Sequence, residues 1–216
     1  MSATELQLRT RIIAVARELD AAGLVPNKSG NVSCRSADGL LITPAGVPYR
    51  ELTPDDIVEV PLHGAPDASG RRPSSEWRMH AAIYAARAEA AAIVHTHSPR
   101  ATALACAGRG IPPFHYMIAL AGGDIRCMPY ATFGTAELAE TAVRGLEARR
   151  ATLLGNHGVI ACGSSLQEAH AVAVEVENLA TEYLAMLAAG LEPQLLDEAE
   201  LVRVIAKFTD YGRLGR

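Results

Sequence analysis

The most informative segment of the chain is Ala91-Ala92-Ile93-Val94-His95-Thr96-His97, an apolar run that ends in two histidines. Residues 91–96 have the pattern of a strand buried inside a sheet. Side chains two positions apart on a strand point to the same face, so His95 and His97 lie side by side. Two imidazoles on a rigid strand end suit a metal site. The alternative is two core or surface histidines in accidental register, and the shared face favours the metal.

Two further residues could bind the same ion. His157 lies in Gly155-Asn156-His157-Gly158, a tight turn between apolar strands, where it is either a third ligand or a solvated turn residue. Glu76 belongs to the Ser-Ser-Glu start of a helix, where a carboxylate is also a routine capping or dipole residue. His80 follows four residues later on the same helix face, as a metal partner of Glu76 or as an ordinary contact. Spacing does not separate these interpretations.

The same residues suggest chemistry on a phosphorylated compound. Three nitrogen ligands leave a fourth position open, as catalytic zinc sites require, and an open Zn²⁺ polarises a carbonyl oxygen. Gly30-Asn31 is a glycine-containing turn, and Pro73-Ser74-Ser75 precedes the start of a helix. Backbone N–H groups and the positive dipole end there suit a phosphate. Taken separately, a Ser-Ser pair is more often only a helix cap.

Composition excludes several classes of protein. The chain has 216 residues, 49% of them hydrophobic and 20% charged, which is unlike a disordered protein and is enough for one domain with a sizeable core. Lys and Arg total 20 against 24 Asp and Glu, a net charge of −4. We therefore expect no nucleic-acid partner and no anionic membrane surface. No apolar run approaches the ~18–20 residues of a membrane span.

The cysteines and the first residues bear on the compartment. The four cysteines form no C-x-x-C pair, which favours reduced thiols over a disulfide scaffold or a zinc knuckle. The first residues lack the basic segment and apolar core of a secretory signal. These features predict a cytoplasmic protein.

Periodicity and turn residues predict helices interspersed with hairpin-linked strands. The expected helices are residues 4–22, 74–87, 136–146, 166–189 and 197–208. The expected strands are residues 31–34, 40–43, 57–61 and 91–96 and a hairpin over 152–162, with a loop or short strand at 130–133. The fold class is therefore α/β, with residues 1–216 as a single domain whose sheet is covered by helices on both faces. No G-x-G-x-x-G follows a strand, so a dinucleotide fold is not supported.

Seven segments, taken together and in chain order, resemble the class II aldolase/adducin family. They are Gly30-Asn31-Val32-Ser33, Leu41-Ile42-Thr43-Pro44-Ala45-Gly46, Pro73-Ser74-Ser75-Glu76-Trp77-Arg78-Met79-His80, His95-Thr96-His97, Ile111-Pro112-Pro113-Phe114-His115-Tyr116-Met117, Tyr130-Ala131-Thr132-Phe133-Gly134-Thr135 and His157-Gly158. The resemblance extends from about residue 5 to about residue 212. The His-Tyr-Met and Tyr-Ala-Thr-Phe-Gly-Thr stretches favour the aldolase branch, in particular the L-fuculose-1-phosphate aldolases.

The resemblance implies an architecture and a metal site. The fold would be a central, mostly antiparallel sheet flanked by helices, assembled as a homotetramer with active sites between neighbouring subunits. His95, His97 and His157 match the ligands of one Zn²⁺ per subunit. Glu76 matches a carboxylate that ligates zinc in the free enzyme and then serves as acid/base. His80 becomes a packing residue or a support behind the ligands.

The remaining implied site residues concern the substrate. Asn31, Gly46, Ser74 and Ser75 match phosphate-binding positions. Tyr116 matches a tyrosine that reaches the active site of the adjacent subunit and acts in catalysis. Phe133 and Tyr211 match residues that line the aldehyde side.

The implied activity is that of a metal-dependent aldehyde-lyase. A ketose 1-phosphate is cleaved reversibly, through a zinc-bound enediolate, to dihydroxyacetone phosphate and an aldehyde. The substrate is L-fuculose 1-phosphate or a related 5-deoxy or 5-methylthio pentulose 1-phosphate. Glu76 would protonate C3, and Tyr116 would handle the proton on the aldehyde oxygen. The phosphate would supply binding energy remote from the broken bond.

Three positions depart from the pattern of that branch. Ala45 stands where a threonine is usual, so one hydroxyl donor to phosphate is missing. Lys28-Ser29 replaces a usual Thr-Ala, and Lys28 either supplies a charge in place of the lost contact or is solvated. Asn156 replaces a frequent histidine beside the third ligand. The changes leave the metal chemistry intact and bear on sugar specificity.

Two alternatives to the aldolase activity are open. One is another sugar-phosphate reaction of the family, as a dehydratase, a decarboxylase or a 4-epimerase. The epimerase branch uses an Asp that residues 115–117 do not offer. The other is a non-catalytic scaffold like adducin, against which the complete set of Glu76 and three histidines argues.

Overall fold

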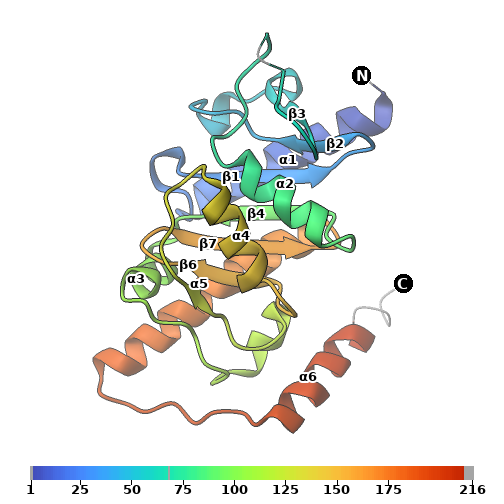
Figure 1. Cartoon of the computed structure of the whole chain (residues 1–216). Coiled ribbons are helices and arrows are strands. Elements are labelled where there is room, and N and C mark those ends of the chain that lie inside the picture. The colour runs from blue at the N-terminus through green and yellow to red at the C-terminus, as the bar shows by residue number, and fades with distance from the viewer. Residues whose placement is uncertain (1, 68, 212–216) are drawn as a thin grey trace.

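The computed structural model describes residues 2–67 and 69–211, of which 209–211 are described by their backbone only. The strands of these residues form a seven-stranded sheet in the order β3-β2-β1-β4-β7-β6-β5 (Figure 1). They are β1 (Gly30–Arg35), β2 (Gly39–Ile42), β3 (Val58–Pro61), β4 (Ala92–Thr96), β5 (Cys127–Met128), β6 (Ala151–Leu154) and β7 (Gly158–Gly163). Every neighbouring pair is antiparallel except β5 with β6. The expected mostly antiparallel sheet is confirmed.

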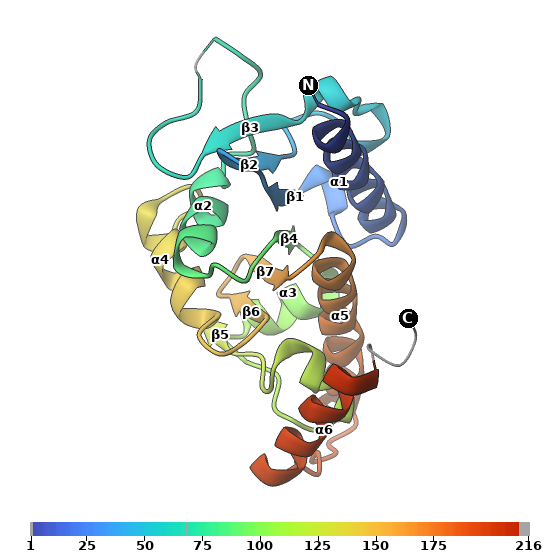
Figure 2. The same cartoon turned by 90° about the vertical axis from the view of Figure 1, so that its right-hand side faces the viewer.

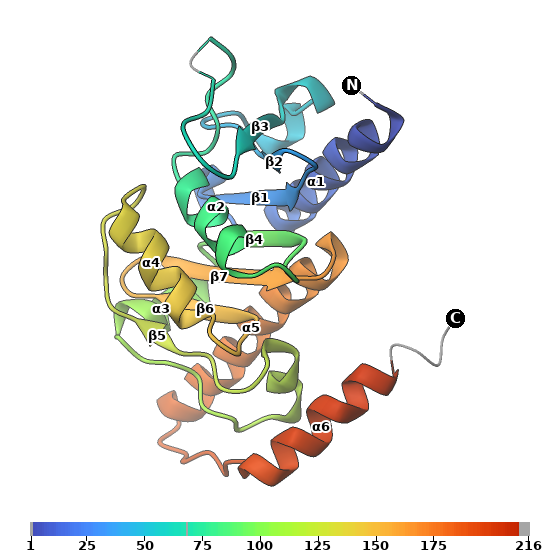
Figure 3. The same cartoon turned by 45° about the vertical axis from the view of Figure 1, so that its right-hand side comes forward.

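Helices cover both faces of the sheet. They are α1 (Ala3–Ala21), α2 (Trp77–Ala86), α3 (Pro99–Cys106), α4 (Ala136–Gly145), α5 (Leu166–Ala188) and α6 (Glu198–Tyr211). Figure 2 shows α1, α3 and α5 on one face and α2 and α4 on the other. Helix α6 lies apart from the sheet and contacts the 3₁₀ turn Tyr116–Ala121 (Figure 3). Within the described residues, no helix is both long enough and apolar enough to cross a bilayer.

Strand β4 lies at the centre of the sheet and is buried along its whole length. Its side chains alternate between two cores. Val94 packs into the core under α1, α3 and α5, and Ile93 packs into the core under α2 and α4. A strand buried on both faces needs a nearly continuous apolar run, which explains why residues 91–94 are all apolar. By the same alternation, His95 lies on the face covered by α2 and α4.

Several short elements were not predicted. Helix α3 is one, because Pro99-Arg-Ala-Thr-Ala-Leu-Ala-Cys is short and consists mostly of small residues. The 3₁₀ turn Tyr116–Ala121 and the two-residue strand β5 are too short for periodicity to indicate. Residues 130–133 are a loop after β5. Helix α2 begins at Trp77, so Ser74 and Ser75 precede it instead of forming its first turn.

Candidate active site

The site forms where the carboxyl end of β4 meets the turn between β6 and β7. His95 pairs with Asn31 of β1 on one side and with Ile160 of β7 on the other. His157 lies in the β6–β7 turn, one residue before β7 begins. A Cβ atom at Gly158 would collide with the Thr96 carbonyl oxygen and lie 2.9 Å from His97 Cδ2. The glycine therefore lets the turn approach β4 closely enough to bring the third histidine to the other two.

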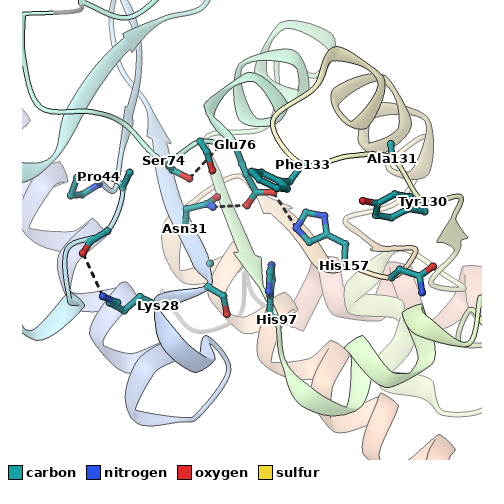
Figure 4. A pocket seen from close by; sticks show the side chains of 16 residues that line it. Lys28, Asn31, Pro44, Ser74, Glu76, His97, Tyr130, Ala131, Phe133 and His157 are labelled. Carbon is teal, nitrogen blue, oxygen red and sulfur yellow. Dashed lines mark hydrogen bonds and ion pairs between the residues drawn. The ribbon is translucent and has the colours of Figure 1, made fainter.

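Glu76 joins the cluster from the other layer. It is the residue preceding α2, yet its side chain makes no capping hydrogen bond. Instead its Oε2 lies 3.0 Å from His95 Nε2 and its Oε1 lies 3.1 Å from His157 Nε2. The Asn31 amide donates to Oε2 at 3.0 Å (Figure 4). The position at the helix start thus serves the cluster and not the cap.

The four side chains are arranged to hold a metal ion. One ligand atom from each of Glu76, His95, His97 and His157 lies within 4.8 Å of all the others. The three imidazole centroids are 4.9 Å apart in every pair. Histidine nitrogens with one carboxylate oxygen are a donor set that suits Zn²⁺ and related divalent ions.

The hydrogen bonding of His95 fits the same conclusion. Its Nδ1 lies 2.7 Å from the Val159 carbonyl oxygen, which can only accept, so Nδ1 carries the proton and Nε2 presents a lone pair. His97 Nε2 lies 3.0 Å from that atom. Without an ion a hydrogen bond joins these two nitrogens, and both face the same point as Glu76 and His157. The residues present therefore fit a metal ion.

Electrostatics prepare these groups as ligands, which bind metals in their deprotonated forms. Burial opposes ionisation of Glu76, but the positive potential of His95 and hydrogen bonds from His157 and His95 outweigh it and hold the carboxyl pKa far below its usual range. Burial, with charge on His95 and His157, lowers the pKa of His97 to about 3, despite the opposing effect of Glu76. Glu76 is therefore anionic and His97 neutral at neutral pH.

A cavity of about 350 Å³ opens next to the cluster. The cavity is lined by the four predicted phosphate-binding residues, Asn31, Gly46, Ser74 and Ser75. Phe133 lines it as well. Glu76 and Ser74 are also linked directly, because the Glu76 N–H donates to Ser74 Oγ at 3.3 Å. The ring of Phe133 is 65% exposed and lies at the rim. Figure 4 shows the side chains of Asn31, Ser74 and Phe133 around the opening.

Two predicted residues lie outside this group. Tyr116 does not line the cavity of its own chain. The residue is 54% exposed, and its ring stacks on Phe208 of α6, with centroids 6.2 Å apart and planes 7° apart. Tyr211 belongs to α6, but its side chain lies outside the described part of the chain.

His80 is fully buried and takes no place in the cluster. Its Nδ1 lies 2.7 Å from Ser33 Oγ, which lies 2.9 Å from the Tyr84 hydroxyl. Burial lowers the pKa of His80 to about 3, with a further contribution from His95 and an opposing one from Glu76. His80 is a neutral packing residue under the site. The interpretation of His80 as a metal partner of Glu76 is therefore wrong.

Sequence reasoning missed three features of the site. The Val159 carbonyl group orients His95, but a backbone group leaves no signal in a sequence. Tyr130 and Asn156 also line the cavity. Tyr130 opens the quoted Tyr-Ala-Thr-Phe-Gly-Thr segment and Asn156 precedes a predicted ligand, so both could have been found by proximity to those motifs.

Comparison with known proteins defines the class. A sequence profile of the family described as "Class II Aldolase and Adducin N-terminal domain" matches residues 10–184, and the chain belongs to this family. With the Glu/His₃ cluster, this membership identifies a metal-dependent aldolase, as the motifs predicted.

The individual relatives are aldolases that are named for sugar phosphates. The chain is 48% identical over 213 residues to the 5-methylthioribulose-1-phosphate/5-deoxyribulose-1-phosphate aldolase of Rhodospirillum rubrum, covering 98% of this chain and 96% of the relative. It is 46% identical over 207 residues to the L-fuculose phosphate aldolase of Escherichia coli K12, covering 95% and 96%. A solved structure of L-fuculose 1-phosphate aldolase matches with a TM-score of 0.91 and 37% identity, covering 97% of this chain and 98% of that one.

Proposed function

We propose that this protein is a zinc-dependent aldolase that reversibly cleaves a ketose 1-phosphate to dihydroxyacetone phosphate and a short aldehyde. The observation that carries the proposal is the Glu/His₃ cluster beside a cavity lined by the predicted phosphate-binding residues. Relatives of nearly equal identity are named for L-fuculose phosphate and for 5-methylthio- or 5-deoxyribulose 1-phosphate. These substrates share a phosphate at one end and an apolar group at the other.

In this proposal His95, His97 and His157 hold the ion, with Glu76 as the fourth ligand before substrate binds. When bound, zinc supplies Lewis-acid polarisation of the substrate carbonyl and stabilises the negative charge that develops as the carbon–carbon bond breaks. The Val159 carbonyl keeps the Nε2 lone pair of His95 directed at the ion. The tightly packed β6–β7 turn fixes His157.

Once substrate has displaced Glu76 from the ion, the carboxylate would take up a proton from solvent and, as the acid, deliver it to C3 of the three-carbon product. Its carboxylate is buried and already in contact with two ligands, so it is within reach of a carbonyl compound bound there. Asn31, Gly46, Ser74 and Ser75 bind the phosphate. Because the Asn31 amide also holds Glu76, phosphate binding and the position of the acid are connected.

The aldehyde side of the reaction requires a second subunit. We propose a homotetramer in which Tyr116 reaches a neighbour's cavity and handles the proton on the aldehyde oxygen. Its exposure, and its absence from the described residues that line the cavity of its own chain, support this arrangement. Phe133, at the rim, and Tyr211 would face the apolar end of the substrate. Residues 1–216 would act as a single class II aldolase-like domain, in the cytoplasm, where the four free cysteines stay reduced.

The test is a cleavage assay with L-fuculose 1-phosphate, D-ribulose 1-phosphate and 5-deoxyribulose 1-phosphate. Release of dihydroxyacetone phosphate is followed with chelator and after zinc is restored. We expect release that the chelator abolishes and zinc recovers, with the apolar-ended substrates preferred. Zinc-loaded protein that releases the product from none of them would overturn the proposal in favour of a dehydratase, decarboxylase or epimerase.

A further inference from the structure

We propose that Lys28 is the counter-ion of the substrate's phosphate and selects phosphorylated over unphosphorylated ketoses. The inference rests on the proposed function and deepens it. Lys28 is the only lysine or arginine among the described residues that line the cavity, and it lies at the edge opposite the metal ligands (Figure 4). Its Nζ lies 3.5 Å from the Gly46 carbonyl oxygen, a long contact to a neutral acceptor.

The backbone of the loop directs this side chain. Asn27 and Lys28 have φ angles of 56° and 64°, in the left-handed region that non-glycine residues rarely adopt. Two hydrogen bonds hold the turn: Lys28 N–H donates to the Val25 carbonyl and Ser29 N–H donates to the Pro26 carbonyl. A strained conformation that is held in this way commonly serves a functional position.

The neutral groups of the cavity offer a phosphate hydrogen bonds but no opposite charge. The Asn31 amide uses one of its two N–H groups on Glu76, and Ser74 Oγ, which accepts from the Glu76 N–H, keeps its own O–H to donate. Ala45 has no hydroxyl group, and its N–H donates to the Arg72 carbonyl. A phosphate dianion that leaves water for such a cavity needs a charged partner. The Lys28 ammonium gains by leaving a carbonyl for a phosphate oxygen, because charge-assisted hydrogen bonds are stronger and shorter.

The composition of the chain provides a direct probe. Lys28 and Lys207 are its only lysines among 20 basic residues. Reductive ¹³C-methylation retains their charge and gives each a separate NMR signal, and Lys28→Arg assigns them. Titration of the zinc-loaded protein with inorganic phosphate should shift the Lys28 signal saturably and leave that of Lys207 unmoved. An unmoved Lys28 signal, or equal drift of both, would overturn the proposal.

Kinetics give a second, independent readout. Lys28→Gln keeps the Cβ atom and most of the stem, so the strain of the loop is matched, but it removes the charge. We expect KM for the phosphorylated ketose to rise about tenfold or more, with kcat little changed, and inhibition by inorganic phosphate to weaken equally. Lys28→Arg should recover most of the affinity. Added salt should raise KM of the wild type more steeply than that of Lys28→Gln.

Arg50→Gln is the matched control, because it removes an exposed charge that lies outside the cavity and is paired with Glu51. Its KM should equal that of the wild type. If Lys28→Gln also keeps its KM and its phosphate inhibition, Lys28 is merely solvated and the proposal fails. If the wild type cleaves no ketose 1-phosphate, the proposed function fails, whereas the phosphate titration still decides the role of Lys28.

Discussion

Glu76 connects the histidine cluster to the side of the cavity where phosphate binding is predicted, through its two carboxylate oxygens. One oxygen contacts His95 and the Asn31 amide, and the other contacts His157. A buried carboxylate is costly unless it is paired and hydrogen-bonded, and here every strong partner belongs to the site. The Glu76 side chain therefore serves the cavity and not the helix that follows it.

His95→Ala is expected to abolish stoichiometric metal binding. The substitution removes a fully buried predicted ligand and leaves Glu76 without one of its two histidine partners. Loss of groups that merely orient a ligand lowers metal affinity about 10–100-fold, and loss of the ligand itself should exceed this. Metal content of the purified variant is measured by elemental analysis, with His170→Ala on α5, outside the cluster, as the control. Full metal content in His95→Ala would show that the ligand assignment is wrong.

At the residue scale, the sequence predicted which residues belong to the site better than it predicted the role of each. The spacing of His95 and His97 indicated a shared face, and the structure confirms it. Glu76 and His80 could not be separated from spacing, because carboxylates and imidazoles at the start of a helix have common structural uses. Only packing of α2 over β1 and β4 turns Glu76 into the cluster and places His80 against Ser33.

Among the elements, the close approach of the β6–β7 turn to β4 determines whether His157 reaches His95 and His97. Gly158 pairs with Leu154 across the turn and lies against Thr96 and His97. No side chain fits there without displacing the end of β4. The geometry of the cluster thus depends on one residue that offers no ligand.

Gly158→Ala should therefore lower both stability and metal affinity. The added methyl group must push β7 away from the Thr96 carbonyl, an overpacking that costs about 1–3 kcal/mol. Thermal unfolding and a competitive metal titration measure the two effects. Gly70→Ala is the matched control, since a Cβ there meets nothing within 4 Å. Equal behaviour of the two variants would show that the turn is not closely constrained.

Helix α3 and strand β5 show what local pattern fails to indicate. Both are short, and neither offers enough residues for periodicity to distinguish them from loops. Their order comes from tertiary contacts: Ala101, Leu104 and Ala105 of α3 are buried in the core shared with α5. The Ala105 carbonyl also accepts from the N–H of Asn156, so α3 supports the ligand-bearing turn.

At the scale of the whole molecule, Tyr116 and α6 lie away from the cavity of their own chain. Tyr116 stacks on Phe208 and remains half exposed. Helix α6 contacts little of the chain besides the 3₁₀ turn that carries Tyr116 (Figure 3). Such a surface suits a neighbouring subunit, which the proposed tetramer would supply.

Tyr116→Phe should keep its metal and lose turnover. The substitution leaves the ring stacking intact and removes only the hydroxyl proposed to transfer a proton in a neighbouring site. General acid–base assistance of this kind is typically worth about 10²–10⁴-fold, so kcat should fall within that range. Assays of kcat and of metal content in the same preparation provide the measurement. Unchanged turnover would remove Tyr116 from the mechanism.

Mixed subunits test where Tyr116 acts. Each inactive variant keeps what the other lacks, so unfolding and reassembly of Tyr116→Phe together with His95→Ala should restore about one quarter of the sites if every site draws on two subunits. Each variant reassembled by itself is the control. Failure to recover activity in hybrids that are shown to form would place Tyr116 within its own subunit's site or outside catalysis.

Residue types and periodicity predict the candidate ligands, the shared face of His95 and His97, the buried strand and the helical layers on both faces of the sheet. These follow from residue identity and from periodicities of 2 and 3.6, which are local properties of a chain. Tertiary structure decided which of several candidate groups meet. The contact of Glu76 with two histidines, the burial of His80 and the direction of Lys28 arise between segments far apart in the chain. No local pattern encodes such contacts, because they depend on how whole elements pack.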